Sequence, residues 1–175
     1  DSMVNHYTAN KRLRSNDAYT PGGAAGFRPD YAVETYTRIL KRLYPRTPVV
    51  VGGIEASLRR LTHYDYWQDK LKRSVLLDSG ADLLIYGMGE RTVVDLARRL
   101  DAGESIADIT DLPQTAMLRP LTEIPEASDA DNIVLASYEE CLADKRAQAV
   151  NFKFVEQESN RHDGRAAIWQ ATGDK

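Results

Sequence analysis

Residues 47–61 read TPVVVGGIEASLRRL, and this stretch decides the expected fold. Residues 47–51 form an apolar, β-branched run without polar alternation, which predicts a strand buried on both faces, as in a parallel sheet covered by helices. Gly52 and Gly53 end that strand sharply. Residues 54–61 are then expected to begin a short helix, so the stretch forms one strand–glycine–helix unit.

The same pattern occurs a second time further along the chain. Residues 82–86 are the expected strand, Gly87 and Gly89 lie in the turn, and residues 92–100 show helical spacing. The other expected elements are a helix over 31–43 capped by Asp30, a helix over 67–77 ending before Gly80, strands at 115–119 and 166–171, a surface connection at 120–131, and a helix over 138–157. This alternation indicates an α/β fold of three layers with a short, mostly parallel sheet.

The chain divides into two parts by composition. Residues 1–30 are irregular, with turn-forming glycine and proline, and residues 31–175 form the predicted α/β domain. A capping box, Ser137 with Glu140, opens the last expected helix.

Composition and charge exclude several classes of protein. The 175 residues carry 23 Lys and Arg against 26 Asp and Glu, a net charge of -3, which argues against a strongly basic nucleic-acid binder. No apolar run approaches the roughly 18–20 residues of a membrane span. The single cysteine, Cys141, excludes a disulfide within the chain and a metal site of several cysteines. A reducing cytoplasm is the simplest expected location.

The two glycine turns are the strongest candidates for a ligand site. Both follow strand ends, and parallel neighbouring strands would bring the turns to one sheet edge, where ligands bind in such folds. Arg59 and Arg60 can pair with a phosphate or carboxylate, and Ser57 can donate a hydrogen bond. Glu55 and Glu90 can accept hydrogen bonds from hydroxyl groups. The plain alternative is two tight turns with a solvated arginine pair.

Two other motifs have a structural and a functional interpretation. The aromatic cluster at 63–67 can stack a flat ligand, or it can pack a loop onto the core. Its His63 and Asp65 have no second histidine or thiolate nearby, so no metal site is expected. The basic run at 11–14 can contact RNA or a phosphate, although the acidic charge of the whole chain argues against a broad nucleic-acid surface.

Four long stretches resemble the YgiQ-type radical SAM proteins. They are residues 1–12, 19–23, 51–67 and 81–91. The resemblance implies the N-terminal region of a larger bacterial protein, with a Rossmann-like fold similar to cobalamin-binding domains. It also implies a later barrel that holds a 4Fe-4S cluster on a Cys-x3-Cys-x2-Cys motif, binds S-adenosylmethionine, and cleaves it reductively to a carbon radical.

This sequence departs from the family pattern in ways that limit what it implies. Cys141 alone cannot form the cluster motif, and the cobalamin signature Asp-x-His-x-x-Gly is absent, since Tyr66 and Trp67 follow Asp65. We therefore expect an accessory domain that is not catalytic alone, whose strand-end cleft covers the barrel mouth and helps to hold a substrate or small cofactor. The expected cofactor-binding residues are Gly52, Gly53, Glu55, Ser57, Arg59, Arg60, Gly87, Gly89 and Glu90.

Two other functions stay open at this point. The domain can be a scaffold whose glycine turns only form an interface, or an RNA-contacting module. The resemblance also implies that the chain starts after the first strand and helix of the domain, which leaves a bare sheet edge. We expect the isolated chain to self-associate, or residues 1–30 to cover that edge.

Overall fold

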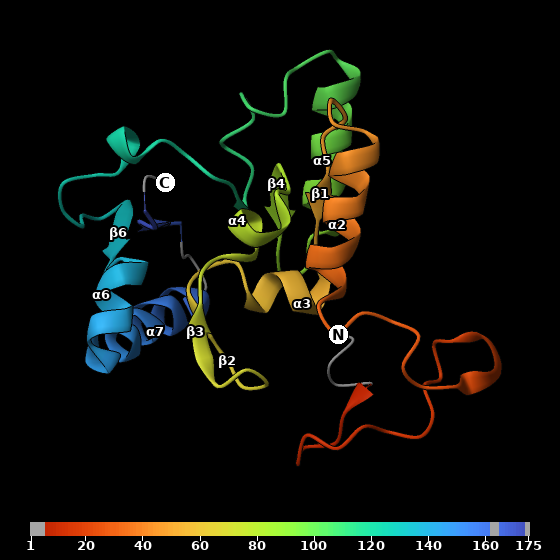
Figure 1. Cartoon of the computed structure of the whole chain (residues 1–175). Helices are drawn as coiled ribbons and strands as arrows, with labels where there is room; N and C mark the ends of the chain where they lie inside the picture. The colour runs from red at the N-terminus through yellow and green to blue at the C-terminus, as the bar shows by residue number, and fades with distance from the viewer. Residues whose placement is uncertain (1–5, 162–164, 174–175) are drawn as a thin grey trace.

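The central sheet has the strand order β1–β4–β5. The computed structural model describes residues 6–161 and 165–173. In it, β1 (Val50–Val51) runs parallel to β4 (Leu83–Ile85), and β5 (Thr115–Ala116) pairs with β4 in the antiparallel direction. Four helices belong to this part of the chain, as Figure 1 shows: α2 (Ala32–Leu43), α3 (Gly53–Leu58), α4 (Val75–Ser79) and α5 (Glu90–Asp101).

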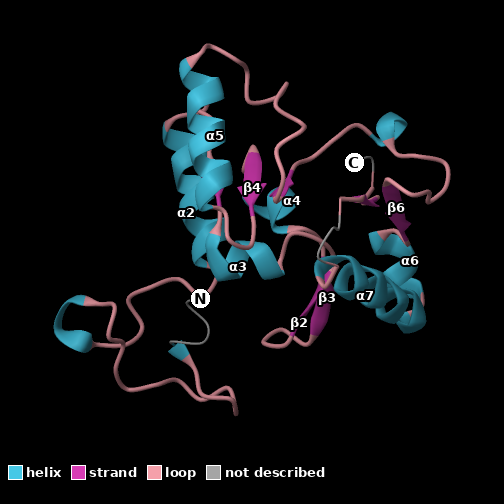
Figure 2. Cartoon of the chain, turned by 180° about the vertical axis from the view of Figure 1, so that it is seen from behind, coloured by secondary structure: helices cyan, strands magenta, loops and turns pink. Residues whose placement is uncertain are grey.

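Two apolar cores lie on the two faces of this sheet. One contains Val51 and Leu84 with residues of α3 and α4, and the other contains Leu83 and Ile85 with Leu96 of α5. Neighbouring residues of β4 enter opposite cores because side chains alternate along a strand. Figure 2 shows α5 on the face opposite to the one seen in Figure 1. The expected α/β class with helices on both faces of a sheet is therefore confirmed, while the likeness to cobalamin-binding domains stays a prediction.

The C-terminal part forms its own small sheet. There, β6 (Asn132–Leu135) pairs in parallel with β7 (Ala167–Gln170), and α6 (Tyr138–Ala143) and α7 (Lys145–Ser159) pack nearby. The capping box is confirmed. The helix expected over 138–157 is broken at Asp144, whose extended backbone ends α6 and whose carboxylate accepts from the N–H of Arg146 to begin α7.

The prediction of a helix over 67–77 is wrong. A hairpin of β2 (His63–Asp65) and β3 (Lys70–Lys72) stands there, followed by α4. The Asp65 carboxylate accepts from the N–H groups of Trp67 and Gln68, and Asp69 adopts a φ of 53°, so local turn chemistry outweighs helical spacing. Gly80 ends α4 in the left-handed conformation, as expected of a C-terminal cap.

Three further expectations need correction. The described strands form three small sheets of mixed direction, not one mostly parallel sheet. The strand expected over 47–51 is two residues long, because the N–H of Val49 donates to the Asp82 carboxylate and not to a neighbouring strand. This strand is not buried on both faces, since Val50 is 39% exposed at the sheet edge. Tyr31, not Asp30, occupies the cap position of α2, while Asp30 lies beside His6 and accepts from the Tyr7 hydroxyl.

Residues 6–30 form an arm that extends away from the sheet (Figure 1). It holds one turn of 3-10 helix, η1 (Pro21–Gly23), and its two bridges, Tyr7 with Leu13 and Asn16 with Ala24, lie within the arm itself. In the described part of the chain the only strand that pairs with β1 is β4, so the arm adds no strand to the open edge. A second 3-10 turn, η2 (Leu121–Glu123), lies in the connection before β6. Over the described ranges, every helix is too short or too polar to cross a membrane.

Candidate functional site

The two glycine turns lie at the same end of the central sheet, as the sequence predicts. Val50 pairs with Leu83 and Val51 with Leu84 in parallel register, so the turns after β1 and β4 leave the sheet side by side. A Cβ atom on Gly52 would lie 3.1 Å from the carbonyl oxygen of Ile85. This strand-end edge, formed by residues 52–60 and 86–90, is the candidate site.

Within the edge, Arg59, the residue that follows α3, forms an ion pair with Glu55 of that helix. Its Nη1 lies 2.8 Å from Oε1 of Glu55, and both side chains are largely buried. The same Oε1 atom accepts from the N–H of Val33 at 3.3 Å, which ties α3 to the start of α2. Sequence reasoning missed this pair, although the i,i+4 spacing of opposite charges was an available signal.

Arg60 points to a different neighbour. Its Nη1 donates to the carbonyl oxygen of Ser57 at 2.7 Å, and its guanidinium lies 4.6 Å from the centre of the Tyr86 ring. The two arginines therefore contact separate groups and do not form one clamp in this structure. Glu90 is exposed at the first residue of α5.

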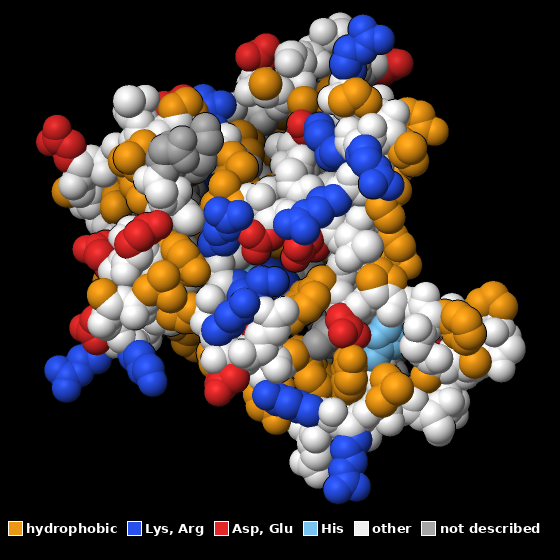
Figure 3. All heavy atoms as spheres, viewed as in Figure 1, with side chains coloured by type: hydrophobic (Ala, Val, Ile, Leu, Met, Phe, Trp, Pro, Cys, Tyr) orange, Lys and Arg blue, Asp and Glu red, His pale blue; other side chains and the backbone are white. Residues whose placement is uncertain are grey.

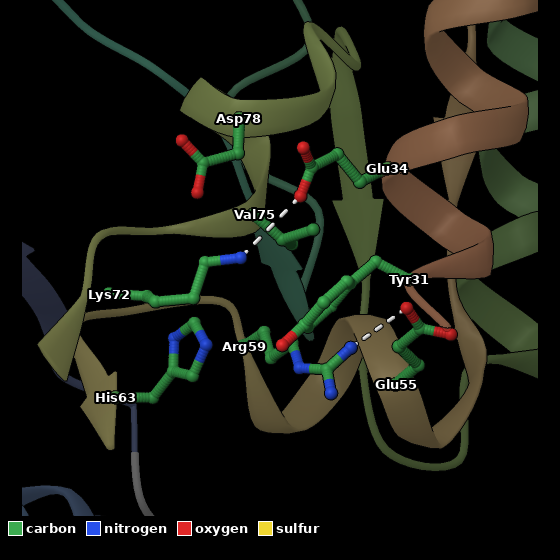
Figure 4. A pocket seen from close by; sticks show the side chains of 8 residues that line it. All are labelled: Tyr31, Glu34, Glu55, Arg59, His63, Lys72, Val75 and Asp78. Atoms are coloured by element: carbon green, nitrogen blue, oxygen red, sulfur yellow. Dashed lines mark hydrogen bonds and ion pairs between the residues drawn. The ribbon is translucent and has the colours of Figure 1, made fainter. Parts of the chain in front are cut away.

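A small hollow lies beside Arg59, between α2, α3, the hairpin and α4 (Figure 4). Its lining residues are Tyr31, Glu34, Glu55, Arg59, His63, Lys72, Val75 and Asp78. The Tyr31 ring has two cations near it, Arg59 at 5.2 Å and Lys72 at 4.2 Å. The hollow measures about 10 Å³, which is the space of roughly one water molecule. A larger ligand would have to displace one of the lining side chains.

Hydrogen bonds and burial shift the pKa values of Tyr31 and His63, which line this hollow, and of Asp65, which is bonded to Tyr31. The Tyr31 hydroxyl donates to Oδ2 of Asp65 at 2.7 Å, and burial together with this bond raises the tyrosine pKa well above its ordinary value. Burial opposes ionisation of Asp65, but bonds from Tyr31, Gln68 and Trp67 lower its pKa below the ordinary value. Burial lowers the pKa of His63, so its imidazole stays neutral at pH 7.

The aromatic cluster at 63–67 has both packed and open members. Trp67 packs against Tyr7 of the arm in a tilted arrangement with ring centres 4.9 Å apart, and the Asp65 carboxylate accepts from the N–H of Trp67 in the hairpin turn. Tyr64 and Tyr66, in contrast, are about half exposed. Tyr31 and Lys72 were missed by sequence reasoning, because long-range folding alone brings them beside Arg59.

Large apolar side chains surround the glycine turns. Ile54 and Leu58 are each 68% exposed and Met88 is 77% exposed. At this edge, then, the charged side chains of Glu55 and Arg59 are paired and largely buried, whereas apolar groups face solvent. Such an arrangement fits a protein contact better than a small polar ligand.

The residues present do not fit an iron–sulfur cluster. In the described ranges, no three His, Cys, Asp or Glu side chains converge as metal ligands. Cys141 is fully buried, and burial raises the pKa of its thiol. A cluster needs several thiolates, and Cys141 is the single cysteine of this sequence.

Comparison with known proteins identifies the family. The chain matches the family described as Radical SAM N-terminal over residues 1–175. It is 58% identical over 173 residues to a UPF0313 protein of Bacteroides thetaiotaomicron, an alignment covering 93% of this chain and 28% of the relative. For a UPF0313 protein of Porphyromonas gingivalis the identity is 58% over 174 residues, covering 99% and 27%. For one of Geobacter sulfurreducens it is 47% over 175 residues, covering 100% and 28%.

The chain spans little more than a quarter of the length of these relatives. No solved structure matches it. The resemblance to YgiQ-type radical SAM proteins, drawn from four stretches of sequence, is confirmed by a match that covers the whole chain. The chain belongs to the Radical SAM N-terminal family.

Proposed function

We propose that this chain is an accessory domain of a radical SAM protein and is not catalytic alone. Its strand-end edge packs against the barrel of the same polypeptide and covers the barrel mouth. The observation that carries this proposal is the open apolar rim of Ile54, Leu58 and Met88 around two glycine turns at one sheet edge.

At the strand-end edge the large apolar side chains are exposed, whereas the buried charged side chains are already paired with each other. Fully burying one large apolar side chain contributes about 1.5–3 kcal/mol, so three of them can stabilise a domain contact. The glycine turns add no side chains there, and the backbone can approach a partner closely. Glu55 and Arg59 are already paired with each other, so the contact does not require new ion pairs.

In this proposal the cofactors belong to the barrel. When bound there, the 4Fe-4S cluster and S-adenosylmethionine would supply a carbon radical, which forms by reductive cleavage of the S-adenosylmethionine. The residues of this chain contribute by excluding water from the mouth and by fixing the position of the edge over it.

A second candidate function places a ligand at the same edge. Arg59 and Arg60 would pair with a carboxylate or phosphate of a substrate or cofactor, with Ser57, Glu55 and Glu90 as hydrogen-bonding partners. Lys72 favours it, because this second cation lies on the Tyr31 ring beside Arg59. The ligand anion would compete with Glu55 for the Arg59 guanidinium.

The test of the docking proposal uses the full-length protein with Ile54→Asp and Met88→Asp together. We expect faster hydrogen–deuterium exchange at the barrel mouth and at residues 52–60, and slower productive S-adenosylmethionine cleavage with unchanged iron content. Leu142→Asp on α6 is the matched control, since Leu142 is similarly exposed at 55%. Identical exchange and cleavage in both variants would refute the docking proposal.

The ligand candidate is tested separately by exchange and charge reversal. Protection of residues 52–60 on addition of S-adenosylmethionine, lost in Arg59→Glu with Arg60→Glu, would support it. Unchanged turnover in that double variant removes the arginines from the site.

A further inference from the structure

Charge is unevenly distributed along this acidic chain. Residues 1–75 carry 13 Lys and Arg against 7 Asp and Glu, a net charge of +6. Residues 76–175 carry 10 against 19, a net charge of -9. The total of -3 therefore conceals a basic N-terminal half, and such asymmetry is a signal of binding to a polyanion. Residues 1–75 thus carry the net positive charge that a nucleic-acid surface needs, although the whole chain is acidic.

Two basic segments of that half form one surface. The Tyr66 hydroxyl donates to the carbonyl oxygen of Ala9 at 3.0 Å, and Lys11 Nζ lies 4.4 Å from the centre of the Tyr66 ring. Together with the packing of Tyr7 against Trp67, these contacts fix the turn of the arm against the hairpin. We call this surface the arm–hairpin face; it consists of Lys11, Arg12, Arg14, Tyr64, Tyr66 and Lys70.

The cations of the arm–hairpin face are exposed, and over the described residues none of them forms an ion pair. The nearby carboxylates already have partners. Asp17 binds Arg28, Asp65 accepts from Tyr31, and Asp69 accepts from the exposed Tyr64 hydroxyl. Figure 3 shows Lys and Arg side chains at the lower end of the molecule with hydrophobic side chains between them. The cations are therefore available to an external anion.

Two open tyrosines accompany these cations. Tyr64, in β2, is 56% exposed, and Tyr66, the first residue of the hairpin turn, is 51% exposed. Neighbouring aromatic rings on which bases stack, beside cations that attract phosphates, are the recurring pattern of proteins that bind single-stranded nucleic acid. An acidic peptide or an anionic membrane would need the cations but not the two exposed rings.

We propose that the arm–hairpin face binds single-stranded nucleic acid. The phosphates lie against Lys11, Arg12, Arg14 and Lys70, and bases stack on Tyr64 and Tyr66. This surface is separate from the strand-end edge, so the proposal goes beyond the accessory role described above. It does not depend on how the edge contacts the barrel.

Fluorescence anisotropy of the full-length protein with a labelled, unstructured 12-nucleotide RNA tests the proposal. We expect the Kd to rise with NaCl, with a slope of log Kd against log [NaCl] of roughly +2 for about three neutralised phosphates. Lys11→Glu with Arg12→Glu should weaken binding at least about tenfold. Arg91→Glu with Arg98→Glu on α5 makes the same charge change at exposed cations of the acidic half and should change the Kd by less than about twofold.

Stacking is tested at Tyr64. Tyr64→Ala should weaken binding by about tenfold, and Tyr64→Trp, which keeps an aromatic face, should retain it. Lys70→Glu on β3 is a second, independent charge variant, and circular dichroism checks the fold of each. Equal binding of single-stranded DNA of the same sequence would support the proposal, because DNA offers the same phosphates and stacking bases as RNA.

Several results would overturn the proposal. They are no binding at low salt, a Kd that does not depend on salt, equal losses in the two charge-reversal pairs, and preference for duplex RNA. Binding of phosphatidylserine vesicles that the Lys11→Glu pair abolishes, while RNA binding is unchanged, would assign the face to membranes instead.

Discussion

The strand-end edge and the arm–hairpin face use the same residue types in opposite ways. At the edge, Glu55 and Arg59 bind each other in a largely buried position, and Ile54 and Met88 face solvent. At the arm–hairpin face the cations face solvent, while Trp67 packs against Tyr7. The difference teaches that the exposure of charged and apolar groups, more than their presence in a motif, indicates the kind of partner a surface fits.

The largest expected effect comes from breaking the buried pair of the edge. Glu55→Ala leaves the Arg59 guanidinium largely buried without its carboxylate and should lower the local stability of α3 by about 3 kcal/mol or more. Hydrogen exchange of residues 53–59 in the full-length protein measures this loss. The control Glu90→Ala, at an exposed glutamate of the same edge, should change stability by less than about 0.5 kcal/mol. Equal effects of the two variants would show that the Glu55–Arg59 pair has no special role.

A second variant tests the close approach at the other glycine turn. A Cβ on Gly89 would clash with the Cγ2 methyl of Ile85, a residue buried in the core beneath α5. Gly89→Ala should therefore destabilise the start of α5 by about 1–3 kcal/mol, as overpacking does. Thermal melting and exchange of the α5 peptides report it. A variant as stable as the parent would show that the turn has room that the structure does not indicate.

The hairpin, which links the two regions, should respond to acid. The Asp65 pKa is lower in the folded chain than in the unfolded chain, so its contribution is present above the unfolded value, near 3.8, and is lost as pH falls through the lower folded value. We expect exchange of residues 63–72 to accelerate in this acid range. Asp65→Asn should remove that part of the pH dependence, and a variant with the parent's acid response would contradict the assignment.

The smallest expected effect concerns the open edge of the central sheet. Val50 of β1 is exposed at this edge, and Leu40 and Leu43 of α2 are exposed as well. Unpaired strand edges associate with other chains, so the chain of residues 1–175 alone should show weak, concentration-dependent self-association by sedimentation. Leu40→Lys with Leu43→Lys should reduce it. Monomers at every concentration would contradict this prediction.

Local patterns predicted the parts of the fold that local chemistry decides. Both strand–glycine–helix units and the meeting of their turns followed from spacing and parallel pairing. The hairpin was missed because the turn bonds of Asp65 outweigh the helical spacing of its neighbours. Arg59 pairs with Glu55, and Arg60 contacts Ser57 and Tyr86, because consecutive residues at a helix end point in different directions. Their binding of a common ligand stays a prediction. Tyr31 and Lys72 meet Arg59 only through the packing of α2 and the hairpin, which no local pattern reports.

The most direct test of the central claim is a photo-cross-linking measurement at Met88. A benzoylphenylalanine placed at this position in the full-length protein should cross-link within the same polypeptide to residues of the barrel mouth. The same label at Leu142 on α6 should not. Cross-links from Met88 only to other molecules, or to no protein residue, would contradict docking of the strand-end edge on the barrel.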